Sequence, residues 1–212
     1  MCGRYKEAES IRRRLVELAM KLNGPLDSLT LRGLLSLGGD LINQGRGNEA
    51  SPYVSEALGG RKKVLGERHP DTLHAATQLS CCMPAKKLAD AVQLAREATA
   101  DLLDTAGEDH EYTYEAMKVL GGLLWKQGKF DEAEIVLRNA LEIGRRKGEA
   151  GAPSTSTNME YLALVLRDKG LLDEAEKYAN IIVAGRINRH GSQHPHVLTS
   201  INLLRSRLGF NT

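Results

Sequence analysis

The sequence predicts an all-α protein, a right-handed α-solenoid of antiparallel helix pairs with about ten helices. Two separate sequence markers recur with a common period close to 42 residues, the size of a unit of two helices and their turns. Between the markers, apolar residues follow one another at the three- and four-residue spacing of a helix face. Aromatic residues make up only 4% of the chain, and the abundance of Leu, Ala, Glu, Lys and Arg favours helices over strands.

The first marker is a turn phrase built around an alanine. Residues 128–134 read Gly-Lys-Phe-Asp-Glu-Ala-Glu, and residues 170–176 read Gly-Leu-Leu-Asp-Glu-Ala-Glu, 42 residues later. The glycine suits a left-handed C-cap after the first helix of a pair, and Asp131 or Asp173 can cap the second helix. The alanine leaves room for the two helices to approach closely. Its positions are Ala8, Ala50, Ala91, Ala133 and Ala175.

The second marker opens each repeat. It reads His-Pro-Asp-Thr at residues 69–72, with related copies at 110–113, 152–155 and 194–197. Its prolines, Pro70, Pro153 and Pro195, suit the first turn of a helix, where the missing N–H is harmless. We expect the marker histidine to bond to the backbone in the turn.

These markers and the apolar spacing give the order of the elements. The expected helices span 4–22, 28–44, 48–65, 71–84, 88–104, 111–127, 131–147, 154–169, 173–189 and 196–208. They form one repeat array over 1–212, with half repeats at 1–26 and 194–212 and whole repeats at 27–68, 69–109, 110–151 and 152–193.

Two places depart from the pattern. Residues 81–87 replace the glycine turn, so an irregular turn is expected there, with at least one of Cys81 and Cys82 buried as a small apolar side chain. Gly59 and Gly60 fall inside the helix expected at 48–65 and should weaken it by roughly 1 kcal/mol each relative to alanine.

The turn phrase, together with residues 65–72 (Leu-Gly-Glu-Arg-His-Pro-Asp-Thr), resembles the kinesin-light-chain class of tetratricopeptide repeat. The resemblance implies a scaffold that binds a peptide or a partner helix in the concave groove lined by the first helices. Such arrays also form parts of signalling NTPases. The alternative is therefore a partner-sensing or oligomerisation region of a larger signalling NTPase or regulatory protein.

In that class an Asn eight residues after the marker histidine holds the backbone of a bound peptide. In this chain the equivalent positions of the successive repeats form a column that reads Leu35, Thr77, Lys118, Glu160 and Asn202. Adding polar positions of two neighbouring columns on the same face gives the candidate peptide-binding residues Arg32, His74, Thr77, Glu115, Lys118, Trp125, Glu160, Arg167 and Asn202. Trp125 fits an interface anchor and core packing equally well.

Composition and motifs argue against other classes of function. A net charge of +2 gives no reason to expect nucleic acid as a partner, no apolar run is long enough to span a membrane, and the three cysteines do not form the framework of a secreted domain. We therefore expect a cytoplasmic protein with a protein or peptide partner. No catalytic constellation stands out, so an enzyme is not expected.

Three further patterns have simpler explanations than chemistry. Residues 45–50 fit a dinucleotide fingerprint but follow a helix instead of a strand, and His190, His194 and His196 lack other ligands nearby, so neither a cofactor nor a metal is expected. The basic runs at 12–14, 61–63 and 145–147 are interpreted as solvated residues near the ends of the second helices.

The ends of the array suggest self-association. Leu15, Val16 and Leu18 in the first helix and Leu204 and Leu208 in the last lack a neighbouring helix within the expected array. The sequence therefore predicts either a fragment of a longer array or head-to-tail packing of one copy on another.

Overall fold

A computed structural model describes residues 2–147 and 153–190, together with Ser206 and Gly209. The chain divides into two compact units, Met1–Ala116 (unit 1) and Met117–Thr212 (unit 2). The boundary falls inside helix α6 (Glu111–Lys126). In the described ranges the chain forms nine α-helices, one short 3-10 helix and no strand.

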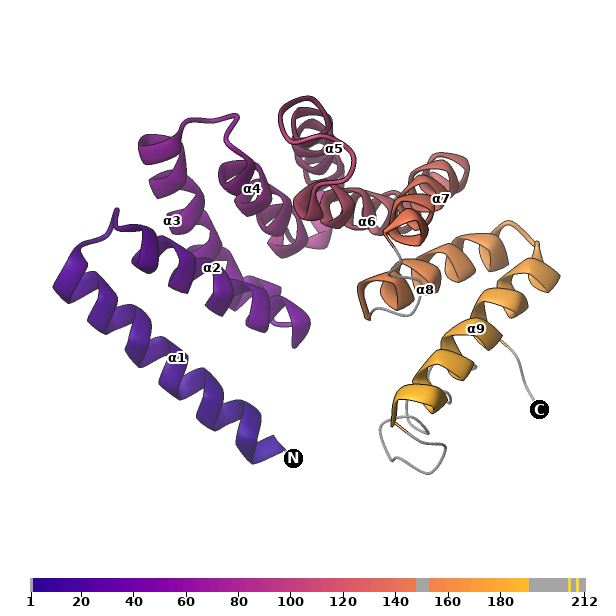
Figure 1. Ribbon diagram of the computed structural model, residues 1–212, viewed down its shortest axis with the longest axis horizontal. Helices are drawn as coiled ribbons and strands as arrows, with labels where there is room; N and C mark the ends of the chain where they lie inside the picture. The colour runs from indigo at the N-terminus through magenta and orange to yellow at the C-terminus, as the bar shows by residue number, and fades with distance from the viewer. Residues whose placement is uncertain (1, 148–152, 191–205, 207–208, 210–212) are drawn as a thin grey trace. The chain divides into compact units, whose positions relative to one another are not determined.

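Unit 1 is built from successive helices that pack on their neighbours (Figure 1). Helix α2 contacts α1, α3 and α4, while α4 also contacts α3 and α5. The bounds are α1 (Cys2–Asn23), α2 (Ser28–Asn43), α3 (Gly47–Leu65), α4 (Pro70–Cys82), the 3-10 helix η1 (Ala85–Lys87) and α5 (Leu88–Thr105), followed by the first part of α6.

Unit 2 contains the rest of α6, α7 (Phe130–Arg146), α8 (Pro153–Asp168) and α9 (Leu172–His190). Helix α8 packs against both α7 and α9. The expected all-α array of helix pairs is confirmed, with nine of the expected helices present. Of the tenth, expected at 196–208, only Ser206 is among the described residues.

Two of the marker histidines, His69 and His110, bond to the backbone as expected, while His194 lies outside the described residues. His69 Nδ1 accepts a hydrogen bond from the backbone N–H of Asp71 at 3.1 Å, and His110 Nδ1 accepts one from Tyr112 at 3.1 Å. Asp27 Oδ1 plays the same part for the N–H of Leu29 at 2.9 Å. Each side chain satisfies a donor that a helix start otherwise leaves without a partner.

The prolines of that marker also lie where they were expected. Pro70 and Pro153 are the first residues of α4 and α8, whereas Pro195 lies outside the described residues. Position N1 tolerates proline because its missing N–H has no partner inside the helix.

The turn phrase is confirmed in part. Gly128 and Gly170 adopt φ values of +80° and +81° after α6 and α8, the left-handed conformation expected of a C-cap. The expectation that Asp131 caps the next helix is wrong, because α7 already begins at Phe130 and Lys129 holds the N-cap position without a side-chain bond. Asp131 and Asp173 lie in the first turn, where an acidic side chain still complements the helix dipole.

The two adjacent glycines have different roles. Helix α3 runs without interruption through both, but a Cβ on Gly60 would lie 2.3 Å from Leu31 Cδ2, whereas one on Gly59 would meet nothing within 4 Å. Gly60 therefore lets α3 approach α2 closely, a role that helix propensity does not reveal. No close contact requires a glycine at position 59, so Gly59 only lowers the stability of the helix.

The irregular turn at 81–87 is confirmed. Met83 and Pro84 have extended backbone, and η1 follows them. Cys82 is buried, and this burial raises the pKa of its thiol to about 12. Cys82 is therefore an unreactive apolar side chain at neutral pH.

Candidate functional site

Unit 1 contains a pocket of about 490 Å³ formed by α2, the end of α3, the start of α4 and the start of α6. Leu31 and Leu35 of α2 form its buried apolar floor. Leu26, Val64 and Leu65 form its rim, with 46%, 54% and 41% of their surfaces exposed. Large apolar side chains that surround a concavity and remain exposed are typical of a surface that buries them against a ligand.

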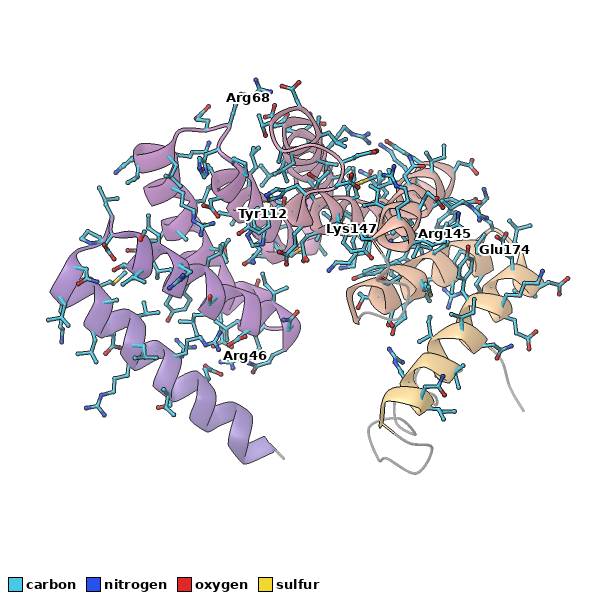
Figure 2. All side chains as sticks on the ribbon, in the orientation of Figure 1. Arg46, Arg68, Tyr112, Arg145, Lys147 and Glu174 are labelled. Carbon is cyan, nitrogen blue, oxygen red and sulfur yellow. The ribbon has the colours of Figure 1, made fainter. Side chains whose placement is uncertain are left out.

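A hydrogen-bonded group holds the polar wall of the pocket in place. Arg61 is 7% exposed, and its Nη1 donates to the backbone carbonyl oxygen of Asp71 at 2.6 Å. The hydroxyl of Tyr112, whose side chain is labelled in Figure 2, donates to Asp71 Oδ1 at 3.2 Å. Burial and the neighbouring Asp71 carboxylate raise the pKa of Tyr112, so it stays a donor at neutral pH. Residues of α3, α4 and α6 are thus joined through Asp71.

His74 and Gln78 offer buried hydrogen-bonding atoms without partners. Burial lowers the pKa of His74 to about 4, so its ring is neutral at pH 7. His74 Nε2 lies 3.2 Å from Gln78 Nε2, while His74 Nδ1 and Gln78 Oε1 have no hydrogen-bond partner among the described residues. Buried polar atoms are seldom left without a partner. Both residues line the pocket, and a small movement of their side chains would bring the two shielded atoms into contact with a ligand there.

Arg32 brings to this pocket a charge that no described residue pairs. Its side chain is exposed on α2 and makes no ion pair or hydrogen bond with any residue that the structure describes. A guanidinium with five unoccupied donors can bind a carboxylate through two parallel hydrogen bonds. The pocket thus combines an apolar rim with polar atoms and a cation, Arg32, that have no partner in the described part of the chain.

The structure brings two of the expected binding residues, Arg32 and His74, into this one pocket. Glu115 is half-buried on α6, and its charge favours the protonated form of His74. Thr77 is 1% exposed and its hydroxyl donates to the carbonyl oxygen of Leu73 at 3.0 Å. Thr77 therefore presents no polar group to the surface.

Five other expected residues belong to unit 2, and the four whose side chains are described all have interaction partners. Trp125 Nε1 donates to Asp168 Oδ2 at 2.7 Å, and its ring packs on a buried cluster that includes Leu164. Arg167 pairs with the same Asp168 at 2.6 Å. Glu160 pairs with Arg186, and Lys118 is half-buried on α6. Asn202 lies outside the described residues.

The sequence did not identify Arg61 as a pocket residue, and its burial contradicts one expectation. The run at 61–63 was interpreted as solvated, which holds for Lys62 and Lys63 but not for the buried Arg61. The reason is helix geometry, since Arg61 follows the buried Ala57 and Leu58 by four and three residues and shares their face. That spacing was the signal in the sequence that could have found it.

The other two basic runs are mostly exposed. Arg145 and Lys147 lie exposed at the end of α7 and just beyond it, as expected (Figure 2). Arg12 pairs with Asp40 at 2.9 Å, and Arg13 is half-buried beside Glu9 at 2.8 Å. Only Arg14 of the first run lacks a partner among the described residues.

Other classes of site find no support in the described ranges. Residues 45–50 join two helices, α2 and α3, and no strand precedes them. No group of three or more His, Cys, Asp or Glu side chains within the described part of the chain could hold a metal ion, although His194 and His196 lie outside it. None of the helices described is both long and apolar enough for a membrane crossing.

Comparison with known proteins agrees with this fold. The family model of the tetratricopeptide repeat matches residues 30–71 and 115–147. Two structures of a Podosopora anserina protein, described as a kinesin light chain with nearly identical TPR-like repeats, align with TM-scores of 0.64 and 0.61, at 20% identity over 90% of each chain. No curated protein matches the sequence significantly.

Two further structures share the fold. BtubC (BKLC) of P. vanneervenii has a TM-score of 0.70 and 17% identity over 97% of this chain and 84% of its own. Aspartyl phosphate phosphatase F of Bacillus subtilis has a TM-score of 0.63 and 13% identity over 83% of this chain, but only 44% of its own. The family model thus identifies tetratricopeptide repeats at residues 30–71 and 115–147, and the chain has the fold of the kinesin-light-chain-like repeat structures.

Proposed function

We propose that this protein is an interaction scaffold, not an enzyme, and that it binds a peptide segment of a partner protein in the pocket of unit 1. The observation that carries the proposal is the exposed apolar rim of Leu26, Val64 and Leu65 beside Arg32, which no described residue pairs. Tetratricopeptide repeats generally mediate contacts between proteins. A ligand with an apolar side chain and a nearby carboxylate would satisfy both features.

The polar atoms of the pocket favour a peptide over a purely apolar ligand. His74 Nδ1 and Gln78 Oε1 are buried hydrogen-bonding atoms without partners, and a peptide backbone carries both donors and acceptors. Each buried atom that gains a partner recovers part of a desolvation cost of about 1–3 kcal/mol. The fixed Arg61–Asp71–Tyr112 group keeps this wall in place before binding, which lowers the entropy cost of association.

Unit 1 is favoured over unit 2 because its pocket contains Arg32, a charged side chain that no described residue pairs. Glu160, Arg167 and Trp125 each already bond to a neighbour within unit 2. A ligand there would have to replace those bonds, whereas Arg32 has none to lose among the described residues. We therefore place the main contact at Arg32 and His74.

Selection of short random peptides on the intact chain supplies a probe for the test. We expect the selected peptides to share an apolar residue and an acidic side chain or a free C-terminal carboxylate. Fluorescence anisotropy should show Kd rising about tenfold for Arg32→Ala and for Val64→Ser. Lys63→Ala, an exposed neighbour on α3 outside the pocket, is the matched control and should leave Kd unchanged.

The opposite result would move the site elsewhere. Selected peptides that bind both pocket variants as tightly as the unmodified chain would exclude this pocket. In that case Trp125→Ala and Glu160→Ala in unit 2 are the next variants to titrate.

A second role, as the partner-sensing or oligomerisation region of a larger signalling NTPase or regulatory protein, draws on one comparison. The chain aligns with less than half, 44%, of the Bacillus subtilis phosphatase, so this fold occurs as part of a longer protein. The full-length gene distinguishes the two roles. A nucleotide-binding domain encoded in the same reading frame would favour the second.

A further inference from the structure

Helix α1 carries a stripe of apolar side chains that faces away from the rest of unit 1. The stripe consists of Ile11, Leu15, Leu18 and Leu22, which are 62%, 59%, 46% and 80% exposed. Their spacing of four, three and four residues is the spacing of the seam through which one helix packs along another. The sequence alone pointed to Leu15, Val16 and Leu18, and Val16 was wrong because its side chain is only 5% exposed.

The opposite face of α1 is already packed. Val16 and Met20 belong to the core cluster that α1 shares with α2, and a Cβ on Gly33 of α2 would lie 3.2 Å from Val16 Cγ2. The stripe is therefore a second apolar face on a helix that is held in place without it. Among the described residues, no other helix exposes more than two large apolar side chains.

The charges beside the stripe indicate what could cover it. Arg14 and Lys21 each follow a stripe residue by three positions, at Ile11 and Leu18, and so border the same edge. Both are exposed, and neither makes an ion pair with any described residue. Glu17, also exposed, lies further round the helix from the stripe.

The other edge is charge-balanced, because Arg12 there pairs with Asp40 at 2.9 Å and both side chains are 40% exposed. The edge that carries Arg14 and Lys21 is therefore the one that favours an acidic partner surface.

These charges disfavour a second copy of the chain as the occupant. Two α1 helices packed antiparallel through their stripes would bring Arg14 and Lys21 of one copy beside Lys21 and Arg14 of the other. Residues 194–212, expected to pack on α1 in a head-to-tail assembly, include Arg205 and Arg207 and no Asp or Glu. Like charges at the border of a helix seam oppose pairing.

We infer that α1 is a docking surface for an amphipathic helix of a partner protein, with apolar residues at heptad spacing and Asp or Glu along the flanks. This surface involves no residue of the pocket of unit 1, so the inference is independent of the proposed peptide site. A helix in this position buries the four stripe residues and pairs its acidic flank with Arg14 and Lys21.

Two synthetic helical peptides test the inference on the intact chain. Both carry leucine at the first and fourth positions of each heptad, and they differ only in having Glu or Lys at the flanking positions. Like charges on their own flanks keep both peptides from pairing with themselves. Anisotropy titrations at low salt should show the Glu peptide binding about tenfold more tightly than the Lys peptide.

Variants of the chain separate the roles of the stripe and of its charges. The double variant Arg14→Glu, Lys21→Glu should reverse the preference between the two peptides. Leu15→Ser should weaken the Glu peptide at least about fivefold. Ile135→Ser, on an α7 residue that is 62% exposed but outside any stripe, is the matched control and should have no effect.

Three results would overturn the inference. The first is equal binding, or no binding, of both peptides to the unmodified chain. The second is an unchanged preference after the double charge reversal. The third is a dimer of the unmodified chain in sedimentation that Leu15→Ser converts to a monomer, since the stripe would then be occupied by a second copy.

Discussion

The imidazole of His74 lies stacked on the ring of Tyr112, with the ring centroids 4.1 Å apart and the planes 12° apart. The two residues come from α4 and α6, and Tyr112 also bonds to Asp71, 41 positions earlier in the chain. This contact between successive repeats forms one wall of the pocket in unit 1. It also buries the titratable ring of His74, so the stability of the folded chain depends on pH through this residue.

Acidification should weaken the folded state through His74. Its pKa is about 4 in the folded chain against 6.5 for an ordinary histidine, so between these values the unfolded chain takes up a proton that the folded chain does not. The stability cost is absent above pH 6.5 and complete below pH 4. At pH 5 it should amount to about 2 kcal/mol.

Urea denaturation of the unmodified chain and of His74→Phe checks this linkage. Phenylalanine keeps a ring beside Tyr112 but cannot titrate. The free energy of unfolding of the unmodified chain should fall between pH 7 and pH 5 by about 2 kcal/mol more than that of the variant. If the free energy of unfolding changed with pH by the same amount in both proteins, this would contradict the buried, neutral state of His74.

The adjacent glycines of α3 should respond to alanine in opposite directions. Gly60→Ala should destabilise the chain by about 1–3 kcal/mol, because its Cβ would lie 2.3 Å from Leu31 Cδ2. Gly59→Ala should stabilise it by about 0.5–1 kcal/mol, because the new Cβ meets nothing and alanine favours the helix. Thermal unfolding distinguishes the two, and equal shifts would show that the Leu31 side chain moves aside for the added methyl group at no cost.

The cap at His69 should be replaceable by a carboxylate. His69→Ala removes the acceptor of the Asp71 N–H and should cost about 1 kcal/mol. His69→Asp should retain most of the stability, since Asp27 already caps α2 in the same way. Loss of equal stability in both variants, measured in urea, would argue against a capping role.

Arg61 and Lys62 should differ although they are adjacent and equally charged. Arg61→Ala removes a buried donor to the carbonyl oxygen of Asp71 and should destabilise the chain by about 2–3 kcal/mol. Lys62, an exposed partner of Glu67, should tolerate alanine within about 0.5 kcal/mol. Similar losses of stability for both variants in urea denaturation would show that Arg61 is solvated and not buried.

Local signals explain why most of the fold could be predicted from the sequence. The caps at His69 and His110 and the turns at Gly128 and Gly170 depend on residues that are close in the chain, and together they mark where the helices begin and end. The alanine of each turn phrase is buried wherever its side chain is described, because the helices meet there. Because these signals are local, the repeat period can be recognised without knowing which distant segments are in contact.

The features that escaped prediction depend on contacts between distant segments. Gly60 is necessary only because Leu31 of another helix lies against it. The pocket requires Tyr112 to reach Asp71 in the previous repeat. Counting positions from the marker placed Arg32 and His74 in the pocket but also selected Thr77, whose side chain is buried. The position of a residue within the repeat fixes only the side of the helix on which it lies, whereas its burial depends on the neighbouring helices.

Amide hydrogen exchange of the unmodified chain, with and without a peptide selected on it, tests the proposed binding site most directly. Binding in the pocket of unit 1 should slow exchange in residues 28–36 of α2 and 61–65 of α3, which carry most of its lining. Exchange in α7 (Phe130–Arg146) should stay the same. Protection confined to helices of unit 2, with residues 28–36 and 61–65 unaffected by a peptide that binds, would contradict the assignment of this pocket as the peptide site.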